Sequence, residues 1–129
     1  MTSAPPDPSE LLAVTAARAA DDKGATDVMV LQVGPVLGIC EYFVLASAAN
    51  DRQVKAVVDA VEARVGDDLG EKPRSVEGAD GRRWVLIDYG DVVVHVFHVE
   101  EREYYRIERL YSDAPSVLWQ PAGQGRAGS

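Results

Sequence analysis

The sequence predicts one α/β (α+β) domain in which helices pack on a mixed β-sheet. Apolar runs of strand length alternate with segments of helical spacing, and 129 residues suit a single domain. The expected order is helix, strand, strand, helix, short strand, strand, strand, helix. Because both a hairpin and longer connections occur in this order, the sheet should combine antiparallel with parallel pairs.

The composition favours a soluble cytoplasmic protein with a basic partner. Twenty-one acidic against 13 basic residues give a net charge of -8, which argues against direct binding to nucleic-acid phosphates. Cys40 is the one cysteine, so no intramolecular disulfide can form and a reducing compartment is expected. The first ten residues lack the features of a signal peptide, and no apolar run approaches the roughly 20 residues of a membrane helix.

The first half of the chain predicts a helix and two strands. Residues 1–8 are proline-rich and expected to be disordered, and Ser9 is a candidate cap for a helix that Gly24 ends. The apolar face of that helix should contain Leu11, Leu12, Ala16 and Ala19. Residues 27–33 and 41–48 are nearly continuously apolar, as in strands covered on both faces, and a loop at 34–38 separates them.

A second helix follows, with a clear start and a regular apolar stripe. Asn50 and Gln53 form a capping pair, and Gly66 is the expected end. Valines recur at helical spacing on one side: Val54, Val57, Val58, Val61 and Val65. Since valine is a mediocre helix former, packing against the sheet must hold this helix. Residues 74–77 predict a short strand.

The runs WVLID and VVVHVF, either side of Tyr89-Gly90-Asp91, predict a β-hairpin. With a two-residue loop, one face of the hairpin would carry Trp84, Leu86, Val93, His95 and Phe97, and a three-residue loop would reverse the pairing. Helical spacing then runs through residues 99–110. From Ser112 onward the sequence is rich in small residues, and this segment is expected to be frayed.

The hairpin also carries the candidate partner-binding residues, which are Trp84, Asp88, Tyr89, Asp91 and His95. Tryptophan and tyrosine are enriched in binding hot spots, and aspartates near them suit a basic partner. Each has a structural alternative, because Trp84 can be a core aromatic and aspartate beside glycine is common in turns. The sequence alone leaves both interpretations open.

Metal binding and catalysis find little support in these residues. His95 and His98, with Glu100, suggest a metal site, but two histidines three residues apart on a strand point to opposite faces. Asp88 and Asp91 form a possible carboxylate pair, yet no nucleophile, glycine-rich loop or oxyanion donor accompanies them. We therefore expect no catalytic residue, no metal and no cofactor.

WVLIDYGDVVVHVFHVEEREYYRIERLY resembles the signature of the ribosomal silencing factor (Iojap) family, and EYFVLASAANDRQVKAVVDAVEARV resembles its preceding strand and helix. With DVMVLQV, the resemblance covers residues 9–112, flanked by a disordered segment 1–8 and a flexible tail 113–129. The chain departs from the family where Ala48-Ala49-Asn50 replaces Gly-Thr-Ser, and where Gln32 replaces a common aspartate.

The resemblance implies a fold related to nucleotidyltransferases, without their Gly-Ser turn and paired magnesium-binding aspartates. It also implies a homodimer that binds the large ribosomal subunit through ribosomal protein L fourteen. Binding to the subunit-facing surface of that ribosomal protein would prevent the small subunit from joining, and this would repress translation when nutrients are scarce. Two alternatives stay open: a minimal magnesium-dependent nucleotidyltransferase, and a dimeric adaptor for another basic protein.

Overall fold

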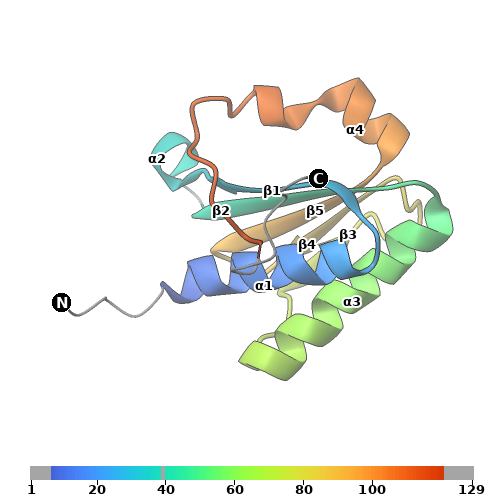
Figure 1. The fold of residues 1–129 in the computed structure, drawn as a ribbon, viewed down its shortest axis with the longest axis horizontal. Helices are drawn as coiled ribbons and strands as arrows, with labels where there is room; N and C mark the ends of the chain where they lie inside the picture. Colours follow the sequence, from blue (N-terminus) through green and yellow to red (C-terminus); the bar gives the residue numbers. More distant parts are fainter. Residues whose placement is uncertain (1–6, 39, 121–129) are drawn as a thin grey trace.

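The computed structural model describes residues 7–38 and 40–120 and contains the expected mixed sheet. Its strands are β1 (Thr26–Gln32), β2 (Tyr42–Ala48), β3 (Ser75–Glu77), β4 (Trp84–Asp88) and β5 (Val92–His98). They lie in the order β1-β2-β5-β4-β3, with β2 and β5 parallel and the other pairs antiparallel (Figure 1). The helical segments are α1 (Pro8–Asp22), α2 (Gly34–Leu37), α3 (Asp51–Leu69), α4 (Val99–Tyr105) and the 3-10 turn η1 (Ile107–Arg109). The predicted fold class is confirmed.

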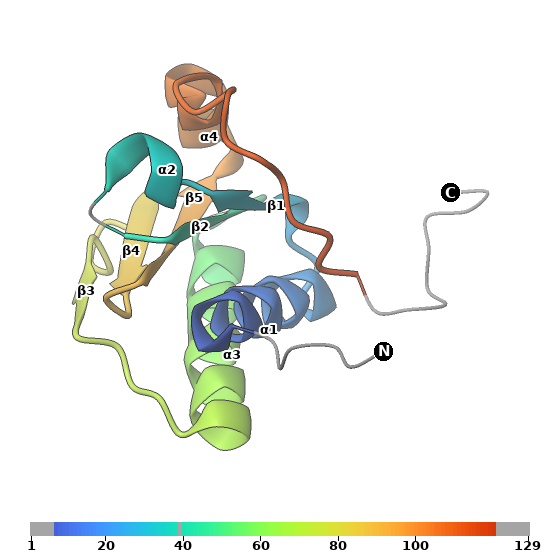
Figure 2. The same ribbon diagram turned by 90° about the vertical axis from the view of Figure 1, so that its left-hand side faces the viewer.

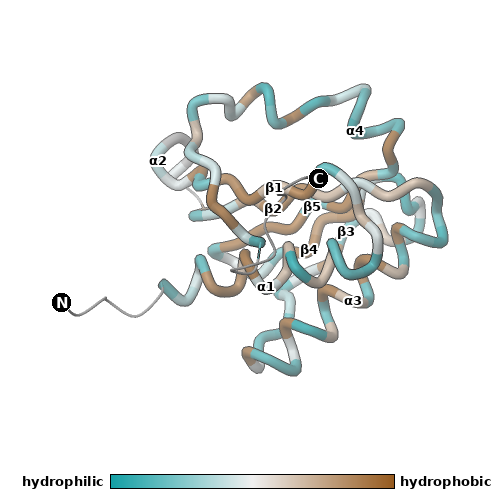
Figure 3. The backbone as a smooth tube through the Cα atoms, in the orientation of Figure 1, coloured by the Kyte–Doolittle hydropathy of each residue, from teal (hydrophilic) through white to brown (hydrophobic). Residues whose placement is uncertain are grey.

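The two faces of the sheet are covered unequally. Helices α1 and α3 pack along one face, whereas α2 and α4 lie over the other (Figure 2). Alternation along β2 turns Val44 towards α1 and α3, and Phe43 and Leu45 towards the α4 side. All the predicted stripe valines of α3 are buried, as expected for a helix held by packing. The strands are the most hydrophobic part of the chain and α4 is largely hydrophilic (Figure 3).

The hairpin register selects the two-residue loop. Asp88 pairs with Val93, and the Tyr89 N–H donates to the Val92 carbonyl at 2.9 Å, which leaves Gly90-Asp91 as the loop. Gly90 has a φ of +94°, a conformation that a glycine adopts without strain. The prediction for a two-residue loop is therefore confirmed: Trp84, Leu86, Val93, His95 and Phe97 share one face.

Several predictions in the first half of the chain are wrong in detail. Asp7, rather than Ser9, caps α1 by accepting a hydrogen bond from the Ser9 N–H, and Leu11 is 41% exposed. Helix α3 continues past Gly66 to Leu69, because Gly70 adopts the left-handed conformation that ends it. The expected loop after β1 contains the short helix α2. The N-terminal part of β1 is exposed, so this edge strand is only partly covered.

The helix expected over residues 99–110 is shorter. Arg106 has a φ of +47°, so α4 ends at Tyr105 and the chain turns into η1. The charged, aromatic spacing continues beyond this break, which is why periodicity alone did not reveal it. The break folds Ile107 back into the core beneath α4.

The expected fraying of the tail is wrong for residues 113–120. The Val117 N–H donates to the Val30 carbonyl at 2.8 Å, and Trp119 is buried with its Nε1 donating to the Val28 carbonyl at 3.1 Å. This segment therefore shields the free edge of β1, which would otherwise be open to pairing with another chain. Residues 1–6 and 121–129, part of the expected flexible ends, lie outside the described residues. Within the described chain, no helix is long and apolar enough to cross a membrane.

Candidate interaction surface

Part of the sheet face opposite α1 and α3 is left uncovered over β4 and β5. Trp84, Leu86, Asp88 and Val93 are partly exposed there, and His95 is buried beneath them with 5% of its surface exposed. These residues are called the open face below. Alternation in the hairpin places all of them on the same side. The arrangement is a sheet surface with apolar and polar groups, held by regular strand pairing.

Trp84 is both a packed aromatic and an accessible one. Its ring lies 4.8 Å from the Phe97 ring and 5.2 Å from the Tyr105 ring, between centroids, and Tyr105 reaches it from α4. The Trp84 Nε1–H donates to His95 Nδ1 at 3.1 Å. The indole is therefore fixed in position while part of it remains accessible, as an anchor residue requires.

His95 is neutral, and the structure defines its tautomer. Indole Nε1 can only donate, so His95 Nδ1 must be the unprotonated acceptor and the imidazole proton lies on Nε2. Burial, with a smaller contribution from the positive charge of Arg102, lowers the pKa of His95 from 6.5 to about 4. At neutral pH the Nε2–H is a buried donor with no acceptor among the described residues.

We expect His95 to make the fold acid-sensitive. Between pH 4 and 6.5 the unfolded chain binds a proton at His95 that the folded chain does not, so stability falls as the pH is lowered through this window. The loss from this residue should be roughly 2–3 kcal/mol between pH 7 and pH 4.5. Urea unfolding at both pH values measures it. The variant His95→Phe should lose correspondingly less on acidification, and equal losses in the two proteins would contradict the prediction.

A pocket of about 310 Å³ opens on this face. It is lined by Cys40, Phe43, Arg74, Leu86, Asp88, Gly90, Val93 and His95. Asp88 Oδ1 accepts from the Gly90 N–H at 2.7 Å, so Asp88 has a turn role in addition to its place in the pocket. Sequence reasoning missed Arg74, which is brought here because β3 pairs with β4 and no local pattern reports that pairing.

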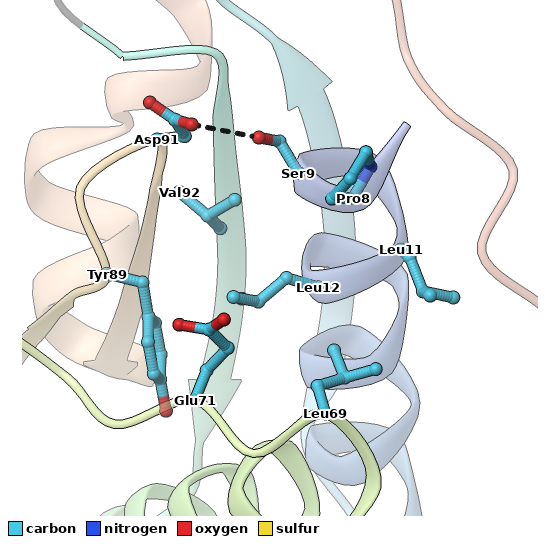
Figure 4. Close-up of a pocket in the computed structure, with 9 residues that line it drawn as sticks. All are labelled: Pro8, Ser9, Leu11, Leu12, Leu69, Glu71, Tyr89, Asp91 and Val92. Carbon is cyan, nitrogen blue, oxygen red and sulfur yellow. Dashed lines mark hydrogen bonds between the residues drawn. The ribbon is translucent and has the colours of Figure 1, made fainter. Parts of the chain in front are cut away.

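The structure separates Tyr89 and Asp91 from the open face. Tyr89 points to the opposite side and packs with the cluster between the sheet, α1 and α3, and Asp91 accepts from the Ser9 hydroxyl at 3.1 Å (Figure 4). Both line a second pocket of about 250 Å³. Burial, with a smaller effect of Glu62, raises the pKa of Tyr89 to about 12. Asp91 is exposed at the hairpin tip, whereas half-buried Tyr89 belongs to the helical layer.

The residues considered for a metal site serve other purposes. His98 accepts the Glu100 N–H on Nδ1 at 3.1 Å and so caps α4. His95 and His98 lie three residues apart on β5 and face opposite sides, as alternation predicts. Within residues 7–38 and 40–120, no group of three or more histidine, cysteine, aspartate or glutamate side chains is arranged to hold a metal ion.

Fold and site together define a small α+β domain with an aromatic sheet face that is partly uncovered. A family model described as "Ribosomal silencing factor during starvation" matches residues 5–127. The chain belongs to this family, which places it among ribosome-associated regulators of translation. The suspected resemblance is therefore confirmed.

Curated relatives come from bacteria, a plastid and a mitochondrion. The ribosomal silencing factor RsfS of Bacillus subtilis is 43% identical over 100 residues, which cover 78% of this chain and 84% of the relative. The chloroplastic protein Iojap of Zea mays is 35% identical over 125 residues, 88% of this chain and 53% of the relative. A Mus musculus protein named "Mitochondrial assembly of ribosomal large subunit protein 1" is 33% identical over 95 residues, covering 70% and 40%.

Solved structures share the fold. A Chromobacterium violaceum crystal structure superposes with a TM-score of 0.75 at 29% identity, covering 89% of this chain and 95% of the other. One from Bacillus halodurans gives a TM-score of 0.69 at 38% identity, covering 84% and 97%. The same single-domain architecture is therefore found in experimentally determined structures.

Proposed function

We propose that this protein represses translation by binding the large ribosomal subunit through ribosomal protein L fourteen and sterically blocking the small subunit, notably under nutrient limitation. The family, described by silencing during starvation, supports the regulatory part of the proposal. The relative named for assembly of the large subunit supports the choice of subunit. The protein acts in the cytoplasm by occupying a surface, with no chemical step and no cofactor.

The observation that carries the proposal is that Trp84 is partly exposed on the open face. A tryptophan that is already fixed by His95 and Phe97 loses little conformational freedom on binding. Leu86 and Val93 beside it add apolar area, which is typical of the centre of a protein interface. We assign the partner contact to the open face and Asp91, and leave out Tyr89 because it faces the helical layer.

Charge supports a basic partner at the edge of this surface. Asp88 lies in the open face and Asp91 is exposed at the adjoining hairpin tip, in a chain of net charge -8. Acidic groups at an interface rim accelerate encounter with a basic protein and fix its orientation. Basic side chains of the partner would therefore pair with these two carboxylates.

Replacing Asp91 with arginine tests this assignment. Asp91→Arg should weaken binding to purified large subunits about tenfold at low salt, with less effect at high salt, because a rim charge acts through screened electrostatics. Quantitative co-sedimentation measures the change. The matched control is Asp59→Arg on α3, also exposed, which should bind as the unaltered protein does. Equal binding of Asp91→Arg and Asp59→Arg would remove Asp91 from the contact.

The proposal includes a homodimer in the free state, as the family resemblance implies. Exposed apolar side chains outside the open face offer area for such a contact, with Tyr104 79% and Leu110 73% exposed. A self-contact over α4 and η1 would leave Leu86 and Val93 accessible to the ribosomal partner.

A further inference from the structure

His95 presents a hydrogen-bond donor for which the part of the chain that the structure describes provides no acceptor. Trp84 Nε1 occupies His95 Nδ1 at 3.1 Å, which places the imidazole proton on Nε2. Nε2 is buried and has no hydrogen-bond partner within the described residues. Buried polar groups in folded proteins are nearly always paired, so this exception requires an explanation.

The unpaired donor belongs to a ring that lines the pocket of the open face. Phe43, Leu86 and Val93 form apolar walls of that pocket, and Arg74 contributes a guanidinium group. Arg74 and His95 are both donors, whereas Asp88 alone supplies a carboxylate. An inserted ammonium or guanidinium group would meet the Nε2–H donor to donor, so the interior of the pocket does not suit a basic side chain.

The geometry points to a specificity contact within the proposed interface: the His95 Nε2–H donates to a neutral acceptor oxygen, a carbonyl or hydroxyl, that the polypeptide partner inserts into this pocket. The inference rests on the proposed function and refines it. Basic residues of the partner pair with aspartates at the rim, while a neutral residue with an acceptor enters between Phe43, Leu86 and Val93.

Binding should involve a small local movement. Water does not reach Nε2 in the free protein, so a lining side chain must shift before an acceptor can approach. Leu86 is the cross-strand neighbour of His95 and is partly exposed, which makes it the candidate for a rotamer change. Rotamer changes of this kind are common at interfaces whose backbone stays fixed.

The alternative role for His95 is to hold Trp84 and nothing more. Two variants separate the roles: Trp84→Phe removes the indole N–H but keeps an aromatic ring, and His95→Phe keeps a ring between Phe43 and Phe97 but has no donor. If His95 only positions the indole, His95→Phe should have no further effect once Trp84 is phenylalanine. If His95 also donates to the partner, the double variant should bind about tenfold more weakly than Trp84→Phe alone.

The measurement is equilibrium binding of each full-length variant to purified large subunits, at low and at high salt, with thermal unfolding as a folding control. We expect the additional tenfold loss at both salt concentrations, because a contact with a neutral acceptor is not screened. Equal binding of Trp84→Phe and the double variant would overturn the inference, as would a His95 effect that disappears at high salt. If the unaltered protein does not bind large subunits, the proposed function fails first, and the inference fails with it.

A second readout does not depend on substitution. In protein labelled with ¹⁵N in its imidazole rings, His95 should show the Nε2–H tautomer when free. Adding isolated ribosomal protein L fourteen should shift the His95 Nε2 resonance, while His98, which caps α4, serves as the internal reference. An unchanged His95 resonance in a saturated complex would contradict a hydrogen bond to the partner.

Discussion

Replacing Arg102 with methionine is expected to destabilise the protein by about 3 kcal/mol. The Arg102 side chain is buried and donates to Glu108 Oε1 at 3.0 Å, to Ser47 Oγ at 2.9 Å and to the Asp27 carbonyl at 3.0 Å. Methionine fills much of the volume but leaves the hydroxyl of Ser47, which is 2% exposed, without its donor. The expected loss of stability lies near the lower end of the range for a broken buried ion pair, because the Glu108 carboxylate is partly exposed and water can hydrate it.

The arginine also fastens α4 to the sheet, so the loss should have a local signature. Arg102 joins α4 to β1 and β2, and its guanidinium lies 5.8 Å from the centre of the Phe97 ring. Urea unfolding gives the global change, and amide hydrogen exchange should show α4 losing protection first. Arg109→Met, an exposed arginine in η1, is the control and should change stability by less than about 0.5 kcal/mol. Equal stability of the two variants would contradict the role of Arg102.

Replacing Trp84 with alanine should weaken binding to the large subunit at least about 30-fold, equivalent to roughly 2 kcal/mol. The change removes the anchor of the open face and leaves His95 Nδ1 without its donor. It also removes packing against Phe97 and Tyr105, so a loss of stability is expected at the same time.

The second tryptophan provides the matched control. Trp119 is buried at the opposite, β1 edge of the sheet, where its Nε1 donates to the Val28 carbonyl. Trp119→Ala should lower the midpoint of thermal unfolding but bind large subunits like the unaltered protein at a temperature where both are folded. If the two variants lost affinity equally, Trp84 would be a packing residue and not an anchor.

The sequence predicted helix α3 and the hairpin correctly, because the sequence signals for these elements are local. The valines of α3 recur at helical spacing, and Asn50 and Gln53 cap that helix as predicted, with the Gln53 N–H donating to Asn50 Oδ1 at 2.8 Å. The hairpin faces followed from alternation once the loop length was fixed by the register. Where periodicity and end signals agreed, the elements could be identified without tertiary information.

The errors arose where a distant contact overrides local preference. Arg106 takes a left-handed conformation in a segment of helical spacing, while neighbouring Arg102 and Ile107 are buried. The segment before residue 121 includes serine, alanine and proline and leads into a tail of small residues, yet Trp119 packs against β1. The apolar residues around Leu118 and Trp119 were the sequence signal for this packing. The small residues of the tail as a whole indicated fraying instead.

The candidate site was predicted in part. Trp84, Asp88 and His95 do meet on one face, and their hydrogen bonds show that structural and surface roles coexist in the same side chains. Tyr89 differs because strand alternation continues through it to the opposite face. Arg74 reaches the pocket through β3, a pairing between segments that the sequence does not relate.

A subunit-joining assay tests the central claim most directly. Purified small and large subunits are mixed with this protein, with Trp84→Ala or with no addition, and joined ribosomes are separated from free subunits by gradient sedimentation. The account predicts that the protein reduces the joined peak and remains with the large-subunit fraction, while Trp84→Ala leaves joining largely intact. An undiminished joined peak in the presence of saturating, folded protein would contradict it.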